Sequence, residues 1–478
     1  MQEIIPNVLA GRYISDEIRN IFTETGKTIA ERDLWIAVMK AQKELGVNIP
    51  AEDIEQFERA KENVNLNLIK EIEKKTKHDV KAKIEAFVQA AGAGEHIHKG
   101  MTSRDLTDNV EQMQIKKASE IIFGKYVAVL ARMIDKAMKY NTTLLTARTH
   151  HQAAQPTLLG RRFSMWAEEL HYHLENFEGF IQNYPLRGIK GPVGTQFDML
   201  TLLGSMEKVN KLEEKVANLL GFQNVLQSTG QVYPRSLDYA FVSNLALLSA
   251  APENFAKTMR LMSGYELVTE GFKGGQVGSS AMPHKMNTAH SERICGLSEM
   301  VKMYADGVSR ISGDQWEEGD VSCSSPRRIV IPDSIFASDG LCETTLDVLR
   351  NMGAYPVMIS KEVDRYLPFL ATTEILMTAV KAGIGRETAH EIIKKYAIQE
   401  ALNMRREGSD KNNLPELLAK DETFAKAGIT SEKIYSILSD REHFIGNAWQ
   451  QIKGVRLKTK PIFERYQKES QYMGKEIL

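Results

Sequence analysis

The sequence predicts a mainly α protein that is built from long helices. Proline is absent from the stretches 51–155 and 369–414, so no proline interrupts a helix there. Apolar residues recur at helical spacing in several segments, whereas alternating strand patterns are nearly absent. The chain has 478 residues, and a length of about 150 residues per domain suggests roughly three domains. We therefore expect a helical protein with several lobes.

Apolar periodicity marks individual helices along the chain. A run at helical spacing leads from Leu34 to Leu45 and stops at Gly46, which suits a left-handed helix end. A second run leads from Val209 to Leu219, again ahead of a glycine. Other segments that we expect to be helical are 161–183, 236–262, 294–308 and 327–353. In 294–308 the apolar steps alternate between three and four residues, as in the seam between packed helices.

Two of these segments, 236–262 and 327–353, carry apolar residues on more than one face. Such a helix is typically surrounded by other helices. We therefore expect these segments in the interior of a bundle, and this pattern suggests an oligomeric one. The best candidate for extended structure is 183–197, which is rich in glycine and proline and could form a short hairpin or a loop.

Glycine and proline indicate the domain boundaries. The Gly-rich stretch 91–100 ends an N-terminal lobe, and the stretch from Pro356 to Pro368 begins a C-terminal one. We expect an N-terminal helical domain at 1–110, a central bundle of long helices at 111–365 and a C-terminal helical domain at 366–478.

The composition excludes several classes of function. The chain has 61 Lys and Arg residues against 62 Asp and Glu residues, which argues against nucleic acid or an anionic membrane as the main partner. No window approaches the ~20 apolar residues of a membrane span, and the start lacks the features of a signal peptide. The three cysteines show no CxxC spacing. We therefore expect a cytoplasmic protein.

The most unusual stretch is the loop 271–287, with the sequence GFKGGQVGSSAMPHKMN. Glycines cost stability unless mobility or close backbone approach is needed. Pro283 suits the first turn of the following helix, so Ser279, Ser280 and Lys285 would lie near a helix N-terminus, where anions bind. A flexible linker with a serine cap would explain the same residues.

Histidines occur in clusters, at His78, at His96 and His98, at His150 and His151, and at His171 and His173. The sequence has no HExxH motif and no cysteine at a suitable spacing, so a metal site is disfavoured. Acid–base histidines fit better, because imidazole titrates near neutral pH. His171 and His173 fall on a polar-faced helix, where we expect them to be solvated.

Three further stretches are polar where a plain bundle would be apolar, and they begin at Thr102, Arg148 and Gln231. The first could simply cap the following helix. Together with the histidines, however, these stretches offer the parts of an anion-binding acid–base site at the ends of long helices.

The sequence GSSAMPHKMN at 278–287 resembles the signature loop of the fumarase/aspartase superfamily, whose members release fumarate by elimination across a C–N or C–O bond. Two further superfamily blocks, 98–105 and 148–155, stand in the expected order. In its details the chain resembles the adenylosuccinate lyase family. These details are Arg12-Tyr13, the block 77–80, the RTHxQ form of the block at 148, the stretch 231–235 and Arg327-Arg328.

The resemblance implies three helical domains, whose long central bundle forms the helical core of a homotetramer with active sites shared between subunits. It implies a succinylated purine nucleotide as the substrate and no cofactor or metal. Ser279 falls on the catalytic base and His150 on the general acid, and His78, His98 and Lys285 complete the catalytic set. The residues that fall on substrate contacts are Arg12, Tyr13, Lys77, Asp79, Thr102, Ser103, Asp105, Thr149, Gln231, Arg235, Asn287, Arg293, Ser324 and Arg328.

The implied chemistry is a β-elimination, in which a base removes a proton beside a carboxylate and an acid protonates the leaving nitrogen. Serine is a weak base, so Ser279 needs activation by Lys285 and the nearby helix N-terminus. Another fumarate-releasing lyase or a cycloisomerase of the same superfamily is an alternative, because the signature loop is shared. A helical interaction protein without catalysis is a third possibility, against which the intact set of Ser279, His150 and Lys285 argues. Thr288 and Gly319 depart from the usual family residues.

Overall fold

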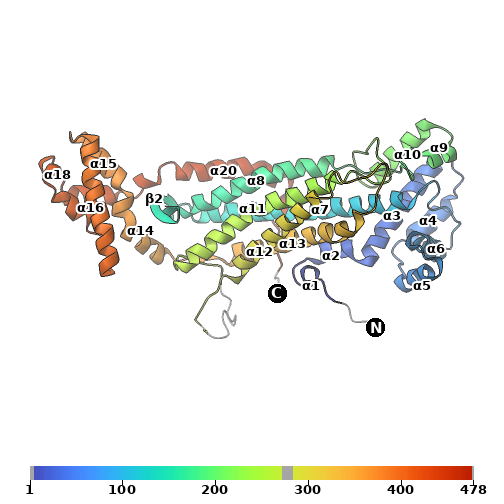
Figure 1. Ribbon diagram of the computed structural model, residues 1–478, viewed down its shortest axis with the longest axis horizontal. Helices are drawn as coiled ribbons and strands as arrows, with labels where there is room; N and C mark the ends of the chain where they lie inside the picture. Colours follow the sequence, from blue (N-terminus) through green and yellow to red (C-terminus); the bar gives the residue numbers. More distant parts are fainter. Residues whose placement is uncertain (1–4, 272–281, 283, 476–478) are drawn as a thin grey trace.

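The computed structural model describes residues 5–271, 282 and 284–475, and the protein is mainly α, as the sequence predicts. Long helices run side by side along the longest axis, and smaller groups of helices lie at both ends (Figure 1). The helices before the long bundle are α1 Val8–Arg12, α2 Asp16–Phe22, α3 Glu24–Glu44, α4 Ala51–Ala60, α5 Leu66–Thr76 and α6 Asp79–Ala91.

The bundle and its connections contain α7 Ser103–Lys139, α8 Leu159–Asn183, α9 Phe197–Leu203, α10 Met206–Leu219, α11 Ser236–Gly264, α12 Ala289–Ser309 and α13 Ser324–Asn351. The chain continues with α14 Pro356–Leu370, α15 Thr372–Lys381, α16 Arg386–Glu407, α17 Leu414–Ala419, α18 Glu422–Lys426, α19 Ser431–Ser439, the 3-10 turn His443–Ile445, α20 Ala448–Arg465 and α21 Gln467–Ser470. Two short antiparallel sheets pair β1 Leu144–Thr149 with β2 Gln152–Leu158, and β3 Val268–Thr269 with β4 Gly353–Ala354.

The helices predicted from periodicity are confirmed. The run that begins at Leu34 forms the second half of α3, which ends before Gly46 at a φ of +100°. The other predicted segments correspond to α8, α10, α11, α12 and α13. The longest helix, α7, has 37 residues and therefore spans about 55 Å. It packs against α3, α8 and α13.

The interior of the bundle is complete within one chain around α13. Every residue from Ser334 to Leu349 is buried, because α1, α2, α7, α11 and α12 all contact this helix. The apolar pattern of 327–353 is therefore accounted for within one chain, and the oligomeric bundle stays a prediction. In α11, by contrast, Tyr239, Leu247 and Leu261 remain exposed.

Extended structure lies elsewhere than expected. The predicted stretch 183–197 is a loop between the last residue of α8 and the first of α9, and a bridge between Leu186 and Val225 holds it. The longer hairpin is formed instead by β1 and β2, directly after α7, and the sequence did not predict it.

The two ends of the bundle carry different helical groups. At one end α14 to α19 share a separate apolar core, which includes Val363, Ile375 and Leu418. The chain then returns along the bundle as α20, beside α8 (Figure 1). Because α20 covers this face, His171 is buried rather than solvated as predicted. His173, which lies on another face of α8, is partly buried.

The division into three domains at residues 110 and 365 stays a prediction. Among the described residues, no helix is long and apolar enough to cross a membrane.

Candidate active site

The start of α7 gathers one group of predicted site residues around His98. The Nδ1 atom of His98 accepts a hydrogen bond of 3.1 Å from Nε1 of Trp35. Indole can only donate, so the neutral ring of His98 carries its proton on Nε2. Burial lowers the pKa of His98, with Asp105 opposing this shift and His78 adding to it. His98 therefore presents a neutral N–H donor at neutral pH.

His78 lies close enough to His98 to influence its charge, but its own side chain is half exposed. Its Nδ1 atom accepts the backbone N–H of Lys81 at 3.3 Å, so His78 caps the start of α6. The predicted contacts Lys77 and Asp79 flank it and are both exposed.

Asp105 is buried, and its predicted role as a substrate contact stays a prediction. Its Oδ1 atom accepts hydrogen bonds from Nη1 of Arg187 at 2.6 Å and from the backbone of Lys190 and Gly191. Its Oδ2 atom accepts the backbone N–H of Thr102 at 2.8 Å. Both oxygens are thus bonded within the chain, and Asp105 ties the loop 187–191 to the start of α7.

Arg235 is also buried, and its predicted contact with the substrate likewise stays a prediction. Its Nη2 atom donates to Asp108 at 3.1 Å, and its guanidinium lies 4.4 Å from the ring of Tyr233. Asp108 also accepts the backbone N–H of Tyr233 at 3.1 Å. Arg235 therefore holds the segment after Gln231 against α7 through Nη2, while its Nε and Nη1 atoms are buried and have no hydrogen-bond partner among the described residues.

Accessible side chains lie around the buried ion pairs of Asp105 and Arg235. Thr102, Ser103, Gln231 and Ser324 are all partly exposed. The sequence analysis missed Arg104, whose Nη2 atom donates to Oγ of Ser324 at 3.1 Å and so joins the starts of α7 and α13. No local signal marks this pair, because its members are 220 residues apart.

Gly319 has a structural explanation in the same region. The backbone N–H of Gln231 donates to the carbonyl of Glu318 at 2.6 Å. A Cβ atom at Gly319 would lie 2.7 Å from Cβ of Gln231. The glycine allows these two segments to approach each other.

The β1–β2 hairpin at the other end of α7 carries Thr149 and His150, and both are exposed. His150 and His151 form the two-residue turn and have φ values of +50° and +60°. Positive φ at both central residues is typical of a type I′ turn, which usually contains glycine or asparagine. The general acid predicted by resemblance therefore projects from a conformation that histidine rarely adopts.

Arg148 fixes the base of this turn. Its guanidinium lies 4.5 Å from the ring centre of Tyr265 and 5.6 Å from that of Tyr366, and it forms an ion pair with Glu362 of α14. The hydroxyl of Tyr265 is 3.3 Å from Nε2 of His151. No local pattern marks Tyr265 or Glu362, because they lie far from Arg148 in the chain.

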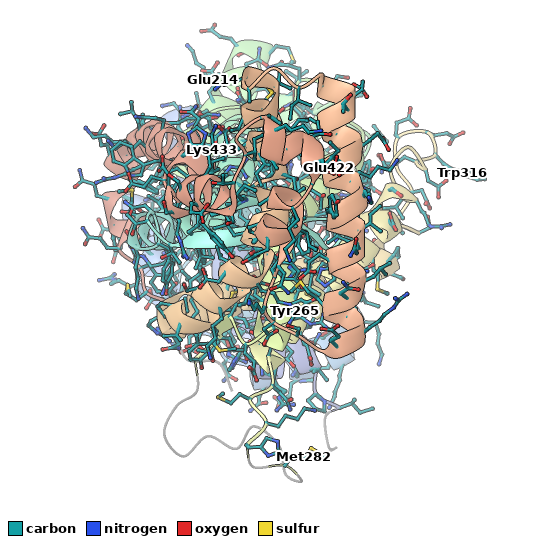
Figure 2. The ribbon with its side chains drawn as sticks, turned by 90° about the vertical axis from the view of Figure 1, so that its left-hand side faces the viewer. Glu214, Tyr265, Met282, Trp316, Glu422 and Lys433 are labelled. Carbon is teal, nitrogen blue, oxygen red and sulfur yellow. The ribbon has the colours of Figure 1, made fainter. Side chains whose placement is uncertain are left out.

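The signature loop is described only in part, and Ser279, Ser280 and Pro283 lie outside the described residues. Lys285 is exposed and Asn287 is partly buried. Figure 2 looks at the hairpin end of the molecule and shows Met282, from the same loop, well away from Tyr265. The helix α12 begins only at Ala289, so the prediction that it starts around residue 283 is wrong.

The N-terminus of α12 already holds a carboxylate of the chain. Glu270 accepts the backbone N–H groups of His290 and Ser291, both at 3.0 Å, and Oγ of Ser291 at 2.9 Å. Although burial opposes the shift, these hydrogen bonds lower the pKa of Glu270. The helix N-terminus expected to bind an anion beside Lys285 is therefore occupied by Glu270.

Arg12, Tyr13 and Arg293 form a further group near the middle of the bundle. The Arg293 guanidinium lies 5.3 Å from the ring centre of Tyr13. Its Nη1 atom is buried and has no hydrogen-bond partner among the described residues, so it could donate to an anionic group. Arg12 at the end of α1 and Arg328 in α13 are exposed.

One chain does not assemble these groups into a single site. His98 precedes α7 and His150 follows it, so about 55 Å of helix separates them. The ends that carry them lie at opposite sides of Figure 1, beside α3 and β2. Within the described residues there is also no group of three or more His, Cys, Asp or Glu side chains that could hold a metal ion.

Comparison with known families first defines the class of protein. A sequence profile described as "Lyase" matches residues 11–302, and one described as "Adenylosuccinate lyase C-terminus" matches residues 368–455. The fold is similar to that of 3-carboxy-cis,cis-muconate lactonizing enzyme from Pseudomonas putida, with a TM-score of 0.81 and 17% identity, over 97% of this chain and 100% of that one. The class is therefore that of the helical lyases.

Relatives then identify the branch of this class. Adenylosuccinate lyase of Saccharomyces cerevisiae is 34% identical over 93% of this chain and 92% of the yeast protein. That of Schistosoma mansoni is 34% identical over 94% of this chain and 93% of its own length. The chain belongs to the adenylosuccinate lyase family, which confirms the resemblance seen in the motifs.

Proposed function

We propose that the protein cleaves adenylosuccinate to AMP and fumarate in purine nucleotide biosynthesis, and likewise succinylaminoimidazole carboxamide ribotide to AICAR and fumarate. The similarity to adenylosuccinate lyases over 93% of the chain is the observation that carries this proposal. It includes all three blocks of predicted site residues. The reaction is an elimination without net electron transfer, so its chemistry requires no redox cofactor.

In the proposed mechanism Ser279 removes the proton beside a succinyl carboxylate, and His150 protonates the leaving nitrogen. The exposed position of His150 on the hairpin is consistent with direct access to substrate. His98 would act as a neutral donor through Nε2, because Trp35 occupies its Nδ1 atom. Lys285 would stabilise the negative charge that develops on the substrate. Glu270 already caps α12, so this stabilisation would come from the ammonium group rather than from the helix N-terminus.

We further propose that the active sites are shared between the subunits of a homotetramer. The separation of His98 from His150 by the length of α7 supports this arrangement, because an antiparallel neighbour would bring its hairpin to the start of α7. The exposed side chains of Tyr239, Leu247 and Leu261 along α11 offer apolar surface for such an association. A cytoplasmic location is part of the same proposal.

An ultraviolet absorbance assay with adenylosuccinate tests the function, with argininosuccinate and malate in parallel. We expect turnover of adenylosuccinate alone. Ser279→Ala should abolish turnover but retain substrate binding, whereas Ser409→Ala, a partly exposed serine in the C-terminal group, should leave activity unchanged. Turnover of another substrate, or full activity of Ser279→Ala, would contradict the proposal.

A further inference from the structure

A cavity of about 420 Å³ lies between the β1–β2 hairpin and the neighbouring parts of α8 and α11. An apolar wall of the cavity includes Trp166, and its polar lining comes from Thr146, Arg148, His151, Arg162, Thr258 and Tyr265. None of these residues belongs to the set to which the resemblance assigns a function. The cavity thus needs its own explanation.

Arg162, in the first turn of α8, is a cation without a carboxylate partner. Within the described part of the chain it forms no ion pair, and its one hydrogen bond is a donation to the sulfur of Met262 at 3.2 Å. Thioether sulfur is a weak acceptor. Glu362 is near enough to act on its charge, but Oε1 of that carboxylate pairs with Arg148, and its Oε2 atom forms no hydrogen bond with Arg162 or any other described residue. Burial lowers the pKa of Arg162 to about 10, against the opposing effect of Glu362.

Thr146 adds a second unused polar group to the lining of the cavity. Its side chain is 1% exposed, and Oγ1 has no hydrogen-bond partner in the part of the chain that the structure describes. A buried hydroxyl without a partner is costly, as is a largely buried guanidinium without an anion. Both penalties would be removed by one ligand that accepts hydrogen bonds from both groups.

We propose that this cavity binds a small organic carboxylate, whose acid group is held by Arg162 and Thr146 and whose apolar part lies against Trp166. A carboxylate matches the two donors, because its two oxygens can accept from guanidinium and hydroxyl together. The lining offers one unpaired arginine, so it suits a single negative charge better than a phosphate dianion. Met262 and Leu267 extend the apolar wall, which favours an organic anion over a hydrated inorganic one.

Propionate is a suitable probe, and its binding to the full-length protein can be followed by calorimetry and by tryptophan fluorescence. We expect saturable binding that is weakened at least about tenfold by Arg162→Met and several-fold by Thr146→Val. Arg162→Lys should retain part of the affinity. Trp166→Phe should remove the fluorescence response but leave the calorimetric signal.

The matched control is Arg161→Met, one residue earlier in α8. Arg161 does not line the cavity, and its Nε atom donates to Gln451 at 3.0 Å on the surface. Three results would overturn the proposal. Propionate could bind wild type and Arg162→Met equally well, Arg161→Met could lose as much affinity as Arg162→Met, or phosphate could bind as tightly as propionate. If Arg162→Met does not fold, the affinity of Thr146→Val for propionate decides the test, because this variant keeps both the shape and the charge of the site. The absence of saturable propionate binding to the wild type would also refute it.

Discussion

A mixture of two inactive variants tests whether the active site is shared between subunits. His98 and His150 lie at opposite ends of α7, about 55 Å of helix apart. If each site takes these two residues from different chains, co-expression of His98→Gln with His150→Gln should restore activity. In a randomly mixed oligomer half of the sites receive an intact His98, and half of those receive an intact His150. About one quarter of the wild-type activity is therefore expected.

The assay is adenylosuccinate cleavage by oligomers purified through different tags on the two variants, and each variant alone should show almost no turnover. The matched control combines His78→Gln with His98→Gln. These two residues influence each other within one chain, so their mixture should regain nothing if they serve the same site. A mixture of His98→Gln and His150→Gln that is no more active than either variant alone would refute the shared site.

Three further predictions concern buried charges. The pKa of His98 is lowered in the folded protein, so the unfolded chain binds the proton first and the free energy of unfolding falls as the pH drops below about 6.5. His98→Gln removes this titration, so thermal unfolding of the variant should depend less on pH in this range. Lys125→Met should lower the free energy of unfolding by about 3–5 kcal/mol, because it leaves its two buried carboxylate partners on α13 without a cation, and urea unfolding at fixed protein concentration measures this. Asp105→Asn should lower the free energy of unfolding by roughly 3 kcal/mol, because it leaves the buried guanidinium of Arg187 without its carboxylate partner. A raised KM at unchanged stability would instead support the substrate contact predicted from the motif.

The helices could be predicted from the sequence because their apolar spacing is local. Residues from Ile294 to Val308 repeat at steps of three and four, and this seam is enough to locate α12. The β1–β2 hairpin could not be predicted in this way. Its turn contains His150 and His151 in place of the glycine or asparagine that marks such turns, and its strands do not alternate cleanly between buried and exposed residues.

The candidate site was predictable in its residue types but less so in their roles. Motifs alone do not separate Asp105, which is buried, from the neighbouring Ser103, which is partly exposed. They also do not show that Glu270 occupies the N-terminus of α12, because this cap is made by a residue about 20 positions earlier in the chain. Burial and long-range partners decide these roles, and both depend on the fold.

The hairpin connects the C-terminal helices to the proposed chemistry, although they contribute no predicted site residue. Left-handed conformations at His150 and His151 cost about 1–3 kcal/mol each, so other contacts must hold the turn. The ion pair of Arg148 with Glu362 of α14 and its contacts with two tyrosine rings supply this support. Since α14 also belongs to the separate core of the C-terminal group, the position of His150 depends on how that group packs against the bundle.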